Sequence, residues 1–171
     1  GLLTLGKVQK VLQNLLRERV SIRNLLTITE TLADYAPMGK DPEILTEYVR
    51  QKLSRSIINT LTDETGALSV LTLTTQIEDL IRESVQSTEQ GSFLALDPNI
   101  GQKIVEAIQA NVDKISQEGY QPIIITSPVV RRHLRRLIDR FMPQVVVLSH
   151  NELTNQSKIQ SLGTVDMKAK K

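Results

Sequence analysis

The chain has 171 residues, enough for one domain or two small ones, and its net charge of +2 is too small to indicate a nucleic-acid-binding protein. It contains no cysteine, which excludes disulfides, thiolate metal sites and a cysteine nucleophile, and aromatic residues make up only 3%, so Leu, Ile and Val must form the core. No apolar run approaches the roughly 18 residues of a membrane-spanning helix, and we expect this segment itself to be soluble.

The start of the chain has the apolar periodicity of an amphipathic helix. Residues at spacings of three and four share one helical face, and here they are Leu5, Val8, Val11, Leu12, Leu15 and Leu16. Ser21 is expected to cap a second helix, which must end before Pro37.

A third helix has the clearest start signal in the chain. Asp41 stands at the cap position and Pro42 at the first helical position, where its missing N–H costs nothing. The apolar face that follows extends to about Asn59. We therefore predict a three-helix bundle over residues 1–62, which is small enough to depend on a neighbouring surface for part of its stability.

The remainder alternates between strand and helix patterns. Residues 63–66 form a turn cluster and the predicted domain boundary, and residues 68–73 are predicted to be a strand. A capping-box pattern over residues 75–78 opens a helix. Residues 86–92 are predicted to be a polar loop, and residues 93–96 a short edge strand.

The same alternation continues towards the C-terminus. Residues 97–98 repeat the Asp-Pro helix start, and Gly119 is placed to end that helix. Residues 122–126 and 145–148 are apolar runs typical of strands buried on both faces. The helix between them is expected to begin at residues 127–128.

These patterns predict an α+β protein overall. The helical bundle of residues 1–62 is followed by a small α/β subdomain over residues 63–171, with a mostly parallel central sheet. Residues 158–165 could add an edge strand, and the Lys-rich tail of residues 168–171 is expected to be flexible.

Motifs for catalysis or cofactor binding are weak. Gly6-Lys7, with Gly1 five residues before Gly6, imitates a nucleotide-binding loop, but Val8 replaces the hydroxyl residue that holds magnesium, so we interpret it as coincidence. His133 and His150 lack a second ligand at metal-binding spacing. His150 follows a predicted strand, where α/β enzymes place catalytic groups, yet no nucleophile accompanies it. We therefore expect no enzyme activity, no metal and no cofactor.

One helix carries an unusual concentration of positive charge. The side opposite its apolar face is formed by Arg131, Arg132, Arg135, Arg136 and Arg140. The ordinary interpretation is a solvated face that pairs with neighbouring acidic residues. The functional alternative is a basic face that binds a nucleic acid or an acidic partner through helix residues 128–141. No aromatic residue is interleaved for base stacking, so we expect no nucleic acid.

Three stretches together resemble a known family. They are GKVQKVLQNLLRERVSIRNLLTITETLADYAP at residues 6–37, KDPEILTEYVRQKLSR at residues 40–55, and PIIITSPVVRRHLRRLIDRFMPQVVVLSHNEL at residues 122–153. Their order and spacing are similar to the C-terminal cytoplasmic region, the third and fourth subdomains, of the FlhA/SctV family of type III secretion export-gate proteins. ADYAP and LTEYVR resemble the flagellar branch more than the injectisome branch.

The resemblance implies a protein-transport module in flagellar biosynthesis. Full-length family members are membrane proteins of the bacterial flagellum, located at the flagellar basal body on the cytoplasmic face of the inner membrane. Their cytoplasmic tails form a nine-membered homo-oligomeric ring. The tails dock export chaperones with their substrates and components of the export ATPase complex. The main chaperone groove lies in subdomains that this chain does not include, so no chaperone-binding residue is carried over.

The resemblance also suggests which charged residues take part in ring contacts. The third subdomain is a helical bundle that contributes to the ring, so the charges expected on the bundle surface are candidates for subunit contacts: Arg17, Asp34, Glu47 and Arg50. Three hypotheses remain open at this point: an export-gate module, a binder acting through the arginine helix, and a hydrolase with a site near His150.

Overall fold

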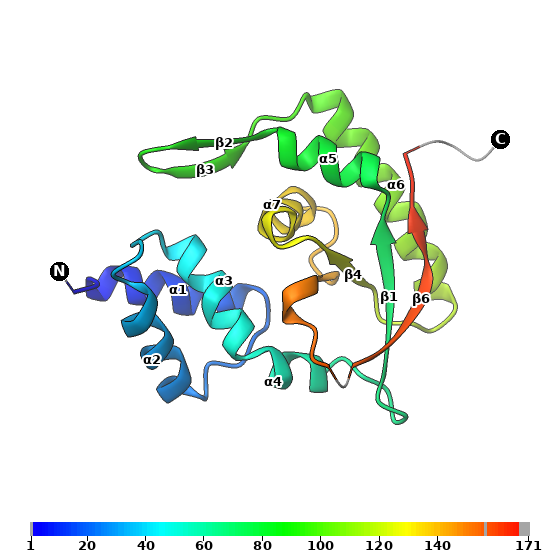
Figure 1. Ribbon diagram of the computed structural model, residues 1–171. Coiled ribbons are helices and arrows are strands. Elements are labelled where there is room, and N and C mark those ends of the chain that lie inside the picture. The colour runs from blue at the N-terminus through cyan, green and yellow to red at the C-terminus, as the bar shows by residue number, and fades with distance from the viewer. Residues whose placement is uncertain (1, 156, 168–171) are drawn as a thin grey trace. The chain divides into compact units, whose positions relative to one another are not determined.

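The structure is a computed structural model that describes residues 2–155 and 157–167 (Figure 1). The chain divides into two compact units. Unit 1 is Gly1–Thr60 together with Glu152–Thr154, and unit 2 is Leu61–Asn151 together with Asn155–Lys171. Among the described residues, no helix is long and apolar enough to cross a membrane. The predicted flexible tail, residues 168–171, lies outside the described residues.

Unit 1 is built from helices. They are α1 (Leu5–Arg17), α2 (Leu25–Tyr35), α3 (Pro42–Lys52) and α4 (Ser54–Asn59). Val11 and Leu15 of α1 are fully buried, as are Ile28 of α2 and Val49 of α3. The predicted third helix is divided into α3 and α4 at Leu53, whose backbone (φ −92°, ψ 5°) leaves the α-helical region.

The helix starts in unit 1 show which cap predictions were right. Asp41 Oδ1 accepts a hydrogen bond from the Glu43 N–H at 2.9 Å, which confirms the predicted start of α3. The prediction for α2 was wrong, because its cap is Asn24, whose Oδ1 accepts from the Thr27 N–H at 3.2 Å. The hydroxyl of Ser21 accepts from a backbone N–H two residues further on, within the loop that precedes α2.

Unit 2 is an α/β unit, and with the helical unit 1 it confirms the predicted fold class. Its strands are β1 (Ala67–Leu73), β2 (Val85–Thr88), β3 (Gly91–Leu94), β4 (Ile123–Thr126), β5 (Val146–Ser149) and β6 (Lys158–Val165). Its helices are α5 (Thr75–Glu83), α6 (Pro98–Gln117) and α7 (Pro128–Ile138). The short 3-10 helix His150–Glu152 follows β5.

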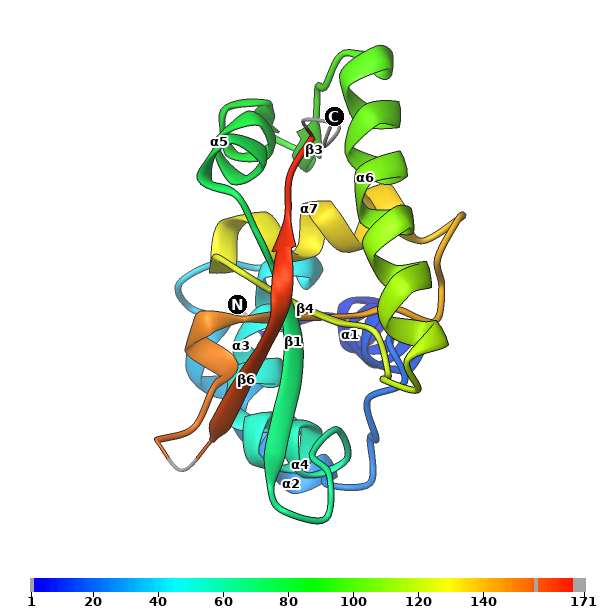
Figure 2. The same cartoon turned by 90° about the vertical axis from the view of Figure 1, so that its right-hand side faces the viewer.

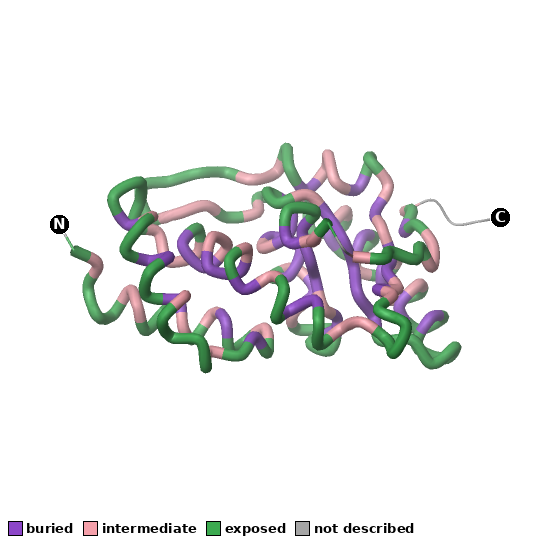
Figure 3. Tube along the Cα trace, turned by 60° about the horizontal axis from the view of Figure 1, so that its bottom comes forward, coloured by how far each residue is buried: buried purple, intermediate pink, exposed green. Residues whose placement is uncertain are grey.

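The main sheet is fully parallel. Its strand order is β5-β4-β1-β6, which makes β5 and β6 the edge strands, and Figure 2 shows β6 running beside β1. The predicted edge strand at residues 158–165 is therefore confirmed. Every residue of β4 is buried. This is the burial expected of a central parallel strand. Figure 3 colours the described part of the chain by burial.

Two local predictions in unit 2 were wrong. Residues 86–92 are not a loop, because β2 and β3 pair as an antiparallel hairpin that forms a separate sheet. The cap of α5 is Thr74, one residue before the predicted box, and its hydroxyl accepts from the Ile77 N–H at 3.5 Å. The Asp97-Pro98 start of α6 is confirmed, and Gly119 follows that helix with φ +89°.

The core of unit 2 lies between the sheet and its helices. Leu71 of β1, Ile124 of β4 and Val147 of β5 belong to one buried cluster with residues of α5, α6 and α7. Ile108 of α6 and Leu134 of α7 are fully buried members of that cluster. The helices thereby cover one face of the parallel sheet, and they carry the charged side chains considered next.

Candidate protein-interaction surfaces

The first candidate set is the four charged residues predicted for subunit contacts. Not all of them lie on the surface of unit 1. Arg17 at the end of α1 and Asp34 in α2 are exposed, and Glu47 in α3 is half-buried. Arg50 is only 2% exposed, so it does not lie on the surface for which it was predicted. Three of the four residues are therefore available on unit 1 for contacts with another subunit.

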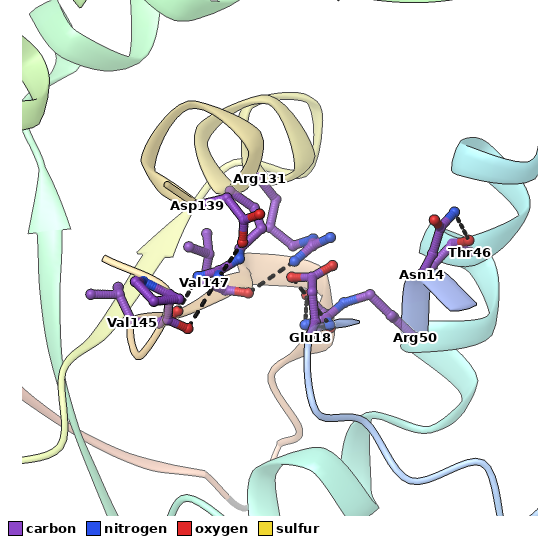
Figure 4. Close-up of polar contacts among 11 residues, drawn as sticks. Asn14, Glu18, Thr46, Arg50, Arg131, Asp139, Val145 and Val147 are labelled. Carbon is purple, nitrogen blue, oxygen red and sulfur yellow. Dashed lines mark hydrogen bonds and ion pairs between the residues drawn. The ribbon is translucent and has the colours of Figure 1, made fainter. Parts of the chain in front are cut away.

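Arg50 is the centre of a buried ionic cluster in unit 1 (Figure 4). Its Nη2 lies 3.0 Å from Oε2 of Glu152, and its Nη1 lies 3.7 Å from Oε1 of Glu18. Glu152 is 1% exposed and the Glu18 side chain 13%. The three side chains come from the end of α1, from α3 and from the segment after β5. This cluster therefore fixes a distant segment of the chain to the bundle.

The second candidate set, the five arginines of residues 131–140, also divides between buried and exposed positions. Four of them lie in α7, and Arg140 follows the end of α7 at Ile138, so the helix predicted over residues 128–141 is shorter than expected. Arg131 and Arg135 are 1% and 7% exposed. Arg131 donates to the carbonyl of Val147 at 3.1 Å, and Arg135 donates to the carbonyl of Val145 (Figure 4). Because the Val146 N–H pairs towards β4, the neighbouring carbonyls of Val145 and Val147 point to the open side of the edge strand.

The two buried arginines therefore cover the free edge of β5. An edge strand presents unpaired backbone groups to any other chain, and proteins protect such edges with charged side chains or covering elements. Arg135 extends the same protection by donating to the carbonyl of Pro143 at 3.1 Å, and its Nη2 pairs with Asp139 at 2.7 Å. This role of the arginines is structural, and sequence reasoning missed it.

The remaining arginines of the predicted basic face lie nearer to solvent. Arg132 is half-buried and donates to the hydroxyl of Ser92 in β3 at 2.8 Å. Arg136 and Arg140 are exposed. The five arginines therefore do not form one continuous solvent-facing surface on α7.

The two histidines lie apart in unit 2. His150 is exposed at the first position of the 3-10 helix after β5, and His133 is buried in α7 at 1% exposure. Beside His150, the hydroxyl of Ser149 hydrogen bonds to Oδ1 of Asn151. Ser149 itself is 2% exposed, so it is poorly placed to meet a substrate. This arrangement gives the hydrolase hypothesis no support.

A groove in unit 2 was not predicted at all. Its volume is about 950 Å³, and α6, α7, β3 and the segment between β3 and α6 line it. Both phenylalanines of the chain belong to its lining, and both are exposed, Phe93 by 44% and Phe141 by 63%. In the sequence, the groove had a single signal: each of these phenylalanines stands beside a polar segment. A buried core residue can stand in the same pattern, so the signal did not predict an exposed groove.

Comparison with known proteins decides the family. The model of the FHIPEP family matches residues 1–158. The chain belongs to the FHIPEP family. This finding confirms the resemblance to flagellar and type III secretion export-gate proteins. It does not depend on any of the candidate surfaces described above.

Individual FHIPEP proteins agree with this assignment. The chain is 42% identical to the flagellar biosynthesis protein FlhA of Bacillus subtilis over 165 residues, which are 96% of this chain and 24% of that protein. The chain thus spans about a quarter of this curated relative.

Solved FHIPEP structures share the fold. CdsV of Chlamydia pneumoniae matches with a TM-score of 0.89 at 34% identity, over 96% of this chain and 47% of that one. The nonameric SctV-C of EPEC, solved by cryo-EM, matches with a TM-score of 0.86 at 35% identity, over 95% and 49%. CdsV has also been solved in complex with CdsO.

Proposed function

We propose that this chain is a non-enzymatic part of the cytoplasmic region of a flagellar type III export gate. In this role it supports assembly of a ring of identical subunits and docks partner proteins of the export machinery. The full-length protein would lie at the flagellar basal body, in the bacterial inner membrane, with this segment on the cytoplasmic side. The observation that carries the proposal is the match of nearly the whole chain to FlhA and SctV relatives.

The ring is the part of the proposal that can be measured with purified protein. The relative SctV-C is nonameric, and unit 1 presents Arg17, Asp34 and Glu47 towards its surroundings. We expect the complete cytoplasmic region of the parent protein to form nonamers in native mass spectrometry. We expect a version without residues 1–171 to stay smaller. Nonamers of unchanged abundance in the truncated protein would remove the ring role from this segment.

Charge reversal at Glu47 should weaken the ring. A charged residue at a subunit interface contributes through complementarity, so Glu47→Arg places like charges together and is expected to lower the affinity between subunits about tenfold. The measurement is the nonamer fraction of the complete cytoplasmic region against protein concentration. The matched control is Glu64→Arg, an exposed residue in the turn before β1. Equal assembly curves for the two variants would exclude Glu47 from the interface.

The partner proteins are proposed by class only. In the family that the sequence resembles, the partners are export chaperones with their substrates and components of the ATPase complex. The solved complex of the relative CdsV with CdsO supports the capacity of this fold to bind another protein. Rigid binding surfaces, with energy supplied by other components, would be sufficient for this role.

Nucleic-acid binding through α7 is the weaker alternative. Two of the four arginines of α7 are buried against the edge of β5, which leaves fewer cations for phosphate contacts. We expect no salt-dependent retention of RNA at physiological ionic strength. If the unsubstituted chain retained RNA and the double variant Arg132→Glu with Arg136→Glu did not, that result would support nucleic-acid binding.

A further inference from the structure

The groove in unit 2 has a charge pattern that suggests its occupant. Its lining includes the apolar side chains of Leu94, Leu96, Val105 and Leu137 beside the two exposed phenylalanines. Its charged lining is mainly acidic, with Asp97, Glu106 and Asp113 from α6 and its cap, and its other polar members are Gln102, Gln109 and His133. One arginine, Arg136, lies on the α7 side. Excess negative charge around an apolar depression attracts a partner that is apolar and basic at once.

Two of the acids are held in place along α6. Gln102 Nε2 donates to Glu106 Oε1 at 2.9 Å, and Gln109 Nε2 donates to Asp113 Oδ1 at 2.7 Å. Glu106 and Asp113 are seven residues apart, which is about two helical turns or 10.5 Å along the axis. Both therefore project on the same side of α6, and the groove has a regularly spaced acidic rim.

We infer that this groove binds an amphipathic α-helix of a partner protein, with apolar residues at spacings of three, four and seven and with two basic residues seven positions apart on one flank. Such a helix has the same axial repeat as the acidic rim, so both basic residues can meet Glu106 and Asp113 together. The rim from Gly101 to Asp113 runs about 18 Å, or three turns of the bound helix. The inference rests on the docking role proposed above and specifies the partner's chemistry.

A second copy of this chain is the competing occupant. Its α1 carries Lys10 and Arg17 seven residues apart, and Leu5 and Leu16 are exposed. Between these leucines, however, the exposed side of α1 has Gln9 and Gln13, so its apolar stripe is interrupted in the middle. The groove lining is largely apolar, and a continuous stripe from another protein fits it better.

The absence of cysteine permits a unique fluorescent reporter. Ala110→Cys places an environment-sensitive dye in the groove lining, and Ser116→Cys places it on α6 outside that lining as the matched control. The probes are two synthetic 15-residue helices with the same leucines at positions 2, 5, 6, 9, 12 and 13. Positions 4 and 11 carry lysine in one peptide and glutamate in the other.

The lysine peptide should bind about tenfold more tightly than the glutamate peptide at low salt, since two ion pairs of ordinary strength give that ratio. The difference should shrink towards 1 M salt, where screening acts within about 3 Å. Glu106→Lys with Asp113→Lys should reverse the preference. Phe141→Ala should weaken both peptides, with little effect on folding because Phe141 is largely exposed. The dye at Ser116→Cys should not respond.

Three outcomes overturn the inference. They are equal affinity for the two peptides, no binding of either, and a dye response to protein concentration alone, which would assign the groove to a second copy. The in vivo role is tested separately, by secretion. If the chain binds the lysine peptide in the groove but is dispensable for secretion, the inference about the groove is supported and the proposed export function is contradicted.

Discussion

Replacing Arg50 with Met should lower the free energy of unfolding by about 3–5 kcal/mol, the usual cost of removing one partner from a buried ion pair. The substitution keeps the length and much of the volume of the side chain, but it leaves the carboxylates of Glu152 and Glu18 without their arginine. Glu152 is 1% exposed and cannot recover its hydration without opening the structure. Among the described residues of unit 1, no other charged side chain is as deeply buried as this pair.

The measurement is urea unfolding at pH 7, followed by near-ultraviolet circular dichroism. The chain has no tryptophan, and two of its three tyrosines, Tyr35 and Tyr48, are stacked in unit 1 with ring centroids 4.1 Å apart, so most of the tyrosine signal comes from the bundle. Arg55→Met, an exposed residue of α4, is the matched control and should change stability by about 0.5 kcal/mol or less.

A double substitution distinguishes lost charge pairing from lost packing. Arg50→Met with Glu152→Met removes both members of the closest pair and leaves Glu18, whose side chain is 13% exposed, as the remaining charge of the cluster. It should recover at least half of the lost stability, because apolar replacements of a buried pair are often neutral. If the double variant were as unstable as the sum of the singles, or if Arg50→Met alone unfolded like the Arg55 control, the cluster would not hold unit 1 together.

Replacing Arg131 with Met should destabilise unit 2 by about 2 kcal/mol, through loss of the donor to a buried backbone carbonyl. The carbonyl belongs to Val147, a 1% exposed residue of the edge strand β5. For a chain of this size the expected fall in Tm is about 4–8 °C. The open strand edge should also make the variant more prone to self-association.

The controls for Arg131 come from the same helical segment. Arg140→Met removes the same charge from an exposed position and should leave Tm and the monomer fraction almost unchanged. Thermal unfolding and light scattering at several concentrations measure the two effects. Equal Tm values for the Arg131 and Arg140 variants would show that the arginine face is solvated, as the sequence pattern first indicated.

Local signals in the sequence were sufficient to predict features that depend only on neighbouring residues, such as the starts of helices. Asp41-Pro42 and Asp97-Pro98 start helices because the cap bond spans only two residues. An edge strand was predicted at residues 93–96, which overlaps the end of β3, but the hairpin itself was missed because residues 86–92 are polar and lack the alternation that predicts a strand. Its turn also lacks the Asn-Gly or Asp-Gly pair that would reveal a hairpin.

Burial of charge could not be read from the helical pattern. Periodicity gives the side of the helix on which Arg131 projects, but the groups that it meets belong to β5, placed there by the order of strands in the sheet. Arg50 and Glu152 are 102 residues apart in the sequence, and no local pattern relates them. The groove likewise depends on how α6, α7 and the hairpin meet in three dimensions.

The most direct measurement is protein secretion in the organism that carries this chain, after an in-frame deletion of these 171 residues from the parent gene. The truncated protein must first be shown to be present in the cells at normal abundance. We predict that hook and filament proteins disappear from the medium and that motility is lost, with both restored by the intact gene. Continued secretion by a stable truncated protein would contradict the assignment of this chain as a working part of the export gate.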